Sequence, residues 1–114
     1  MEKIKGTHSL SSDGERLTVH LAGEIDHHAA APIREAVDSE LYLKRPEELC
    51  LDFSEVRFMD SSAIALIIGR AELARSLGCH VTVRGLSRMQ ERLVRISGVA
   101  RIEGVTVLSG EVKK

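Results

Sequence analysis

Hydrophobic and polar positions alternate near the start of the chain, with the period of a β-strand. Every second position from Leu17 to Leu21 is apolar within residues 16–24, and residues 3–11 form a similar strand-like segment. The Ser12-Asp13-Gly14 run between the two segments has the composition of a tight turn. We therefore predict an N-terminal β-hairpin.

The apolar period then changes to that of a helix. An apolar residue recurs at four-residue spacing: Ala29, Ile33, Val37 and Leu41. Pro32 is tolerated in the first turn of a helix but not in its interior, because proline has no N–H to donate. The helix is therefore expected to begin near Ala30.

Strand-like and helical segments alternate along the rest of the chain. Residues 62–77 have helical length and end at Gly78, a residue suited to a helix C-terminus. Three apolar segments have strand length: residues 48–53, 80–84 and 102–108. This alternation favours parallel strands with right-handed crossovers. The expected fold class is α/β, a mixed and mostly parallel β-sheet with an N-terminal hairpin and about three to four helices, in a single domain over residues 1–114.

The last helix is predicted from a capping box, in which Ser87 and Gln90 stand three residues apart. Ser97 and Gly98 are expected to end this helix. Its spacing predicts an inward face of four apolar residues: Leu86, Met89, Leu93 and Ile96.

Composition and charge argue against several classes of function. Sixteen Lys and Arg against seventeen Asp and Glu leave a formal net charge of -1, and aromatic residues make up 3%. Such a chain is a poor candidate for nucleic-acid binding. Charged residues near the N-terminus, and the lack of an apolar run of ~20 residues, predict a cytoplasmic protein without a signal peptide or membrane insertion. Cys50 and Cys79 are isolated in apolar surroundings and are expected to be reduced packing residues.

Two short motifs raise the question of catalysis or metal binding. Ser61 follows a strand-like segment, as many nucleophiles do, but the G-x-S-x-G elbow and a Gly-rich oxyanion loop are missing. Hydrolysis therefore remains a distant alternative. His27 and His28 are adjacent, whereas metal ligands on a helix usually lie three or four residues apart. We expect a solvated loop there, and no metal or cofactor.

The segment FMDSSAIALIIGR, residues 58–70, places polar residues directly before an apolar run. Asp60 or one of the two following serines is expected to cap a helix, since Asp and Ser are preferred N-caps. The next six residues are apolar on every side of that helix, and a sheet can cover only part of them. Some of Ile64, Ala65 and Ile68 should therefore stay exposed as a docking surface. A phosphate on a serine there would prevent docking while the helix N-terminus tolerates the charge.

FMDSSAIALIIGR, together with GEIDHH at residues 23–28, resembles the STAS-domain family, most closely the bacterial anti-sigma factor antagonists. The family pattern is G-E-[IL]-D after the second strand and D-S-[ST]-G at the start of a helix. The resemblance runs from the opening hairpin to the SGVARI segment at residues 97–102, over nearly the whole chain. It implies the STAS fold.

The resemblance implies a regulatory phosphoprotein rather than an enzyme. In such antagonists the first serine of D-S-S, here Ser61, is phosphorylated by a partner that is both an anti-sigma factor and an ATP-dependent serine kinase. The unphosphorylated antagonist captures that partner and frees the sigma factor, and a PP2C-type phosphatase restores this form. Glu24 also matches the motif, without a defined role. The resemblance carries over Asp26, Asp60 and Ser62 as partner-binding positions, and the neighbouring Ala63 and Ile64 are expected to belong to the same surface.

Ala63 departs from the family pattern, which has glycine after D-S-S. Its methyl group is expected where the backbone of a partner would come close. The alternative function is a STAS regulatory or scaffold subunit of a transport or stress-signalling complex, which is never phosphorylated. Recovery of a small ATPase-type kinase or of a transporter subunit with the protein would separate the two hypotheses.

Overall fold

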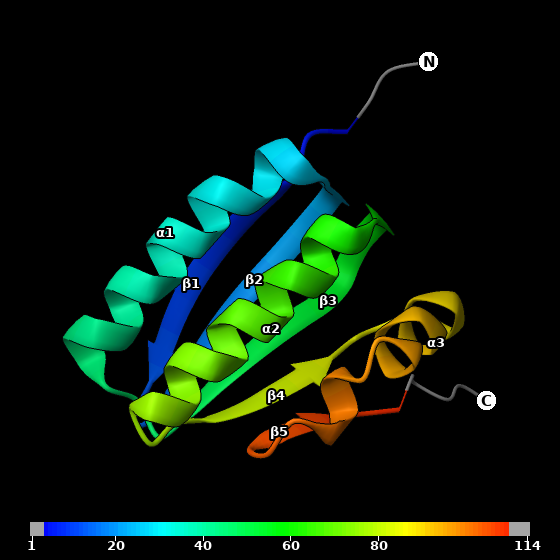
Figure 1. The fold of residues 1–114 in the computed structure, drawn as a ribbon. Helices are drawn as coiled ribbons and strands as arrows, with labels where there is room; N and C mark the ends of the chain where they lie inside the picture. Colours follow the sequence, from blue (N-terminus) through cyan, green and yellow to red (C-terminus); the bar gives the residue numbers. More distant parts are fainter. Residues whose placement is uncertain (1–3, 110–114) are drawn as a thin grey trace.

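The computed structural model describes residues 4–109 of the chain. Its strands form one five-stranded sheet in the order β1-β2-β3-β4-β5, with β1 antiparallel to β2 and the other neighbours parallel (Figure 1). The predicted α/β class with an N-terminal hairpin is therefore confirmed; Lys3, which the prediction included in the hairpin, lies outside the described residues. In chain order the elements are β1 (Thr7–Asp13), β2 (Arg16–Ile25), α1 (His27–Lys44), β3 (Glu48–Met59), α2 (Ser61–Ser76), β4 (His80–Arg84), α3 (Arg88–Ile96), the 3₁₀ helix η1 (Val99–Arg101) and β5 (Val105–Val107).

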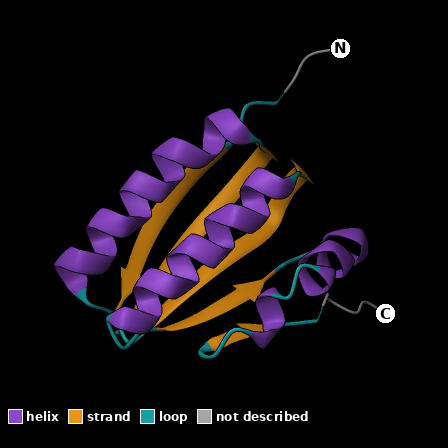
Figure 2. Ribbon diagram, in the orientation of Figure 1, coloured by secondary structure: helices purple, strands orange, loops and turns teal. Residues whose placement is uncertain are grey.

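The helices α1 and α2 lie side by side on one face of the sheet and bury the core beneath them (Figure 2). In the central strand β3, Leu51 and Phe53 point into this core, while Asp52 between them points to the opposite face. The apolar stripe predicted for the first helix is entirely buried: Ala29, Ile33, Val37 and Leu41. The hydrophobic pattern thus identified the contact face of α1 correctly.

The start of α1 differs from the prediction. The helix begins at His27 rather than near Ala30, because Asp26 is its N-cap. The Asp26 carboxylate accepts a hydrogen bond from the Ala29 backbone N–H, with an O–N distance of 3.0 Å. Pro32 consequently lies inside the helix, and the two adjacent histidines lie in its first turn rather than in a loop.

Strand lengths also differ from the prediction. β3 continues to Met59, beyond the expected end at Phe53. In its second half only Val56 and Met59 are buried, and the exposed positions include Phe58 as well as polar residues, so the sequence there does not show the alternation of a strand. The pairing of β2 with β3 shifts register twice in this region, which blurs the alternation in sequence. β5 is shorter than residues 102–108, and the unpredicted η1 precedes it.

The helix α3 turns a different face to the core than the sequence predicts. The predicted capping box is present, since the Ser87 hydroxyl accepts a hydrogen bond from Gln90 N and the Gln90 side chain accepts one from Ser87 N. The predicted inward face is wrong, apart from the buried Leu86 that precedes the helix. Val94 is the fully buried residue of α3. The exposed fractions of the other three side chains are 73% for Met89, 42% for Leu93 and 80% for Ile96.

Both cysteines are buried and free of disulfides, as predicted for packing residues. Burial raises the pKa of the Cys50 thiol, and it raises the pKa of Cys79 to about 11. Both thiols therefore stay protonated and unreactive at neutral pH.

Candidate functional site

Two aspartates lie next to each other where neighbouring strands end and helices begin. Ile25 at the end of β2 and Met59 at the end of β3 are partners in the parallel register. The residues that follow, Asp26 and Asp60, therefore leave the sheet at adjacent positions. Each is a helix N-cap, and Asp60 Oδ1 accepts a hydrogen bond from the Ser62 backbone N–H at 2.8 Å. The fold thus brings together the GEID and DSSA motifs, which are far apart in sequence.

Ser61 is the first residue of α2, and its side chain is exposed. Within residues 4–109 its hydroxyl forms no hydrogen bond to a histidine or to any other group. The nucleophile–base contact that hydrolysis requires is absent from this part of the chain, so nothing here supports the hydrolase alternative. A hydroxyl at a helix N-terminus can instead receive a phosphoryl group from an external kinase, because the helix dipole favours negative charge there.

Apolar surface borders Ser61 along the first turns of α2. Ala65 is exposed, whereas Ile64 and Ile68 are half-buried at the edge of the core. The prediction that part of this apolar run remains uncovered is therefore confirmed. Exposed apolar groups beside a hydroxyl and two carboxylates have the composition of a protein-docking surface with a polar rim.

Ala63 is completely buried and belongs to the hydrophobic core, with an exposed fraction of 0%. Its methyl group therefore cannot touch a docked partner in this conformation, and the sequence-based placement at the partner contact is wrong. The reason is helix geometry: residue 63 lies two positions after the exposed Ser61, which is about 200° around the helix axis. Alanine at this position fills the core between α2 and the sheet.

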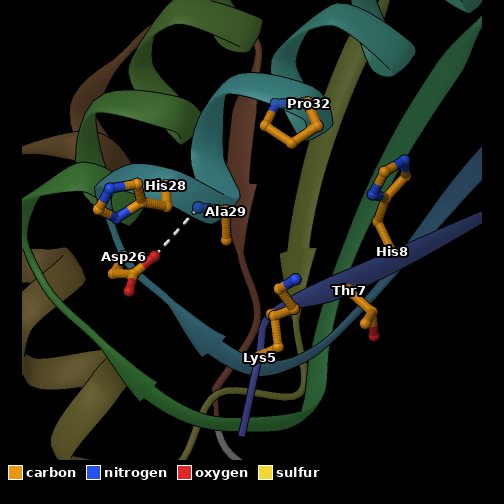
Figure 3. A pocket seen from close by; sticks show the side chains of 8 residues that line it. Lys5, Thr7, His8, Asp26, His28, Ala29 and Pro32 are labelled. Atoms are coloured by element: carbon orange, nitrogen blue, oxygen red, sulfur yellow. Dashed lines mark hydrogen bonds between the residues drawn. The ribbon is translucent and has the colours of Figure 1, made fainter. Parts of the chain in front are cut away.

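A pocket of about 930 Å³ opens beside Asp26, between α1 and the chain leading into β1 (Figure 3). Gly6 makes the close approach of these segments feasible, because a Cβ atom there would lie 2.7 Å from the Ala29 Cβ in α1 and 2.4 Å from the Glu24 carbonyl oxygen in β2. The sequence does not predict this pocket, because it depends on contacts between distant segments. Lys5 forms a β-bridge with Glu24, and the Glu24 backbone N–H donates a hydrogen bond to the Ile4 carbonyl oxygen at 3.0 Å. The lining residues are Lys5, Gly6, Thr7, His8, Asp26, His28, Ala29 and Pro32.

A polar network occupies the opposite face of the sheet. Asp52 accepts a hydrogen bond from the Ser54 backbone N–H at 3.0 Å, and its Oδ2 lies 3.2 Å from His20 Nδ1 and 3.4 Å from Arg84 Nη2. Burial acts to raise the pKa of Asp52, but the Ser54 hydrogen bonds and the Arg84 charge outweigh it and lower this pKa. Because these side chains point away from α2, we assign them to the stability of the sheet rather than to the site.

The residues described by the structure offer neither a metal site nor a membrane span. Between residues 4 and 109, no cluster of three or more His, Cys, Asp or Glu side chains could hold a metal ion. In the same range, no helix has the length and hydrophobicity needed to cross a bilayer.

Several known proteins resemble this chain in sequence and in fold. Residues 8–109 match the family model described as "Mlab, STAS domain". The chain is 33% identical to an anti-sigma F factor antagonist of Paenibacillus polymyxa, over 75% of this chain and 74% of that protein. It is 31% identical to an anti-sigma-B factor antagonist of Listeria monocytogenes, over 88% and 87% of the two chains. The unphosphorylated anti-sigma factor antagonist SpoIIAA has the same fold, with a TM-score of 0.77 at 22% identity over 90% of this chain and 89% of that one.

Proposed function

This chain belongs to the STAS-domain family, and we propose that it acts as an anti-sigma factor antagonist that is switched by phosphorylation of Ser61. The unphosphorylated form would bind an anti-sigma factor that is also an ATP-dependent serine kinase, and would thereby free a sigma factor. A PP2C-type phosphatase would restore the binding form. The role is regulatory and cytoplasmic, and the chain needs no cofactor of its own because the kinase supplies the ATP.

The placement of the Ser61 hydroxyl is the observation that carries this proposal. The hydroxyl is exposed at the N-terminus of α2, next to the capping residue Asp60 and to the strand end that carries Asp26. An approaching kinase can reach it without any rearrangement of the core. Basic groups of the kinase would pair with the two carboxylates, and Ser62 and Ile64 would complete the contact surface.

Phosphorylation would separate binding from folding. A phosphoserine carries nearly two negative charges at neutral pH. Within the chain, the N-terminus of α2 stabilises this charge. A partner docked on Ala65 and its half-buried neighbours would instead have to desolvate the phosphate, which is costly. The phosphorylated protein should therefore stay folded and lose its partner.

The first test compares two adjacent hydroxyls in the same helical turn. The purified protein is incubated with its cognate kinase and ATP, and the product is analysed by intact-mass and peptide mass spectrometry. We expect one added phosphate on the wild type and on Ser62→Ala, and none on Ser61→Ala. Unchanged thermal unfolding of both variants would show that the loss of phosphorylation comes from the missing hydroxyl group and not from unfolding. Phosphate on residue 62, or no phosphate on a folded wild type with an active kinase, would contradict the proposal and favour the scaffold alternative.

The second test asks whether the kinase recognises the side-chain carboxylates of the two N-cap residues, Asp26 and Asp60. Asp26→Asn and Asp60→Asn each remove a charge but retain a good N-cap residue. We expect slower phosphorylation of Ser61 at unchanged thermal stability. Asp13→Asn, in the remote hairpin, is the matched control and should be phosphorylated at the wild-type rate. If both cap variants react as fast as this control, the carboxylates have no part in recognition.

A further inference from the structure

A second apolar surface lies on α3, an element that contributes nothing to the Ser61 site. Met89, Leu93 and Ile96 are spaced by four and three residues, so they share one face of this helix. Met89 and Ile96 are 73% and 80% exposed, and Leu93 is 42% exposed. We call these three residues the apolar stripe of α3.

The outward orientation of this stripe is fixed by contacts on the other side of the helix. Val94 is fully buried in the core. The Gln90 side chain donates a hydrogen bond to the Val56 carbonyl in β3 at 3.2 Å. Arg95 Nη2 donates one to the Val107 carbonyl in β5 at 2.9 Å. Rotation of α3 to bury the apolar stripe would break both hydrogen bonds and expose Val94.

A row of arginines runs beside the apolar stripe. Arg88, Arg92 and Arg95 have the same four- and three-residue spacing, offset from the stripe by one residue or about 100°. Arg95 forms an ion pair with Glu91, Nε–Oε2 2.7 Å. For Arg88 and Arg92 there is no ion-pair partner among residues 4–109. The outer face of α3 is thus half apolar and half basic.

We propose that this face docks an acidic amphipathic helix of a partner protein. Such a helix would lay its apolar side on the stripe and place carboxylates against Arg88 and Arg92, a pairing that satisfies both halves of the surface. Arginine and methionine are also enriched in protein interfaces. From Met89 to Ile96 the surface is about 10 Å long, which matches two turns of a docked helix.

Charge and size distinguish this partner from two other occupants. A second copy of the chain would present another arginine row, and its Glu91 is already paired with its own Arg95. A membrane surface would gain only three apolar side chains from a helix of nine residues, and the strength of membrane binding depends on the apolar area that is buried. The proposal is independent of Ser61 and of its phosphorylation.

The test uses the full chain and two synthetic peptides of about four helical turns. The acidic peptide has leucines at three- and four-residue spacing flanked by glutamates, and the basic peptide has lysine in place of each glutamate. Amide NMR spectra of the protein are recorded during titration with each peptide. We expect the acidic peptide to shift resonances of α3 and its neighbours, and the basic peptide to leave them unchanged.

Variants then assign the two halves of the surface. Met89→Ser combined with Ile96→Ser should weaken binding of the acidic peptide at least about tenfold. Arg88→Glu combined with Arg92→Glu should reverse the preference, so that the basic peptide now binds. Leu43→Ser, at a 75% exposed position on α1, is the matched control and should bind like the wild type.

Three results would overturn the proposal. The first is a titration in which the acidic peptide shifts no α3 resonance. The second is binding of phosphatidylglycerol vesicles through α3 in place of the peptide. The third is a concentration-dependent dimer in sedimentation that the serine variant converts to a monomer.

Discussion

The helices α2 and α3 both carry apolar residues at helical spacing, yet one is largely buried and the other largely exposed. α2 packs against α1, β3, β4 and η1, whereas α3 packs mainly on η1 at the edge of the structure (Figure 1). α2 buries even Arg70, while α3 buries only Val94. An apolar stripe therefore shows which side of a helix can be covered, and the number of neighbouring elements decides whether it is covered.

The largest expected contrast comes from the same substitution in both helices. Ile67 is completely buried in α2, so Ile67→Ala should lower the free energy of unfolding by about 3 kcal/mol through lost packing and a residual cavity. Ile96 is 80% exposed in α3, so Ile96→Ala should change it by less than about 0.5 kcal/mol. Urea unfolding measures both values. Similar losses in the two variants would mean that α3 is packed against something in solution.

An ion pair in each helix gives the next contrast. Arg70 Nε in α2 lies 2.7 Å from Asp38 Oδ1 in α1, and the Arg70 side chain is 8% exposed. Asp38→Ala leaves this buried guanidinium without its counter-charge and should cost about 2 kcal/mol. Arg70→Met removes the buried charge as well and should cost less. Glu91→Gln in the exposed pair of α3 should cost less than about 1 kcal/mol. If chemical denaturation gave the same loss of stability for Asp38→Ala and Glu91→Gln, burial of the α2 ion pair would not contribute to its effect on stability.

Removal of the N-cap should destabilise the protein by a similar amount in both helices, although their burial differs. Asp60 caps α2 and Ser87 caps α3 through side-chain hydrogen bonds to backbone N–H groups. Asp60→Ala and Ser87→Ala should each lower stability by about 1 kcal/mol, because a cap acts on its own helix whatever packs beside it. Thermal unfolding of the two variants is the measurement. A loss confined to α2 would indicate that its cap also supports tertiary packing.

The smallest effect is expected for a charge at the proposed switch. Ser61→Asp places a carboxylate at the first position of α2, where the helix dipole favours it. The free energy of unfolding should change by less than about 0.5 kcal/mol, while binding to the cognate anti-sigma factor is lost. Calorimetry of folding and of binding on the same sample separates the two. A strongly destabilised variant would argue against a switch that leaves the fold intact.

Much of the site was predictable because its signals are local. The Asp60 cap and the capping box of Ser87 and Gln90 depend on a few neighbouring residues. The sequence predicts the capping box itself, and it narrows the cap of α2 to Asp60 or one of the two following serines. The partial exposure of the apolar run after Ser61 follows from helix geometry and was also expected. The start of α1 is set by the Asp26 cap and not by Pro32, so a prediction based on the proline places it too late in the chain.

Other features depend on contacts between distant segments. The pocket beside Asp26 exists because the residues before β1 approach Glu24, and Gly6 has no side chain to prevent it. The adjacency of Asp26 and Asp60 comes from the register of β2 with β3. No spacing within either motif encodes this register.

Periodicity and capping are properties of short segments, so the fold class, the α1 core stripe and the capped, hydroxyl-bearing start of α2 are predictable from the chain alone. Ala63 faces the core, and Val94 rather than Met89 or Ile96 is the buried residue of α3, because burial depends on which neighbouring elements cover each face of a helix. A helix at the edge of a sheet has few neighbours, so it can leave its most apolar side to solvent or to a partner.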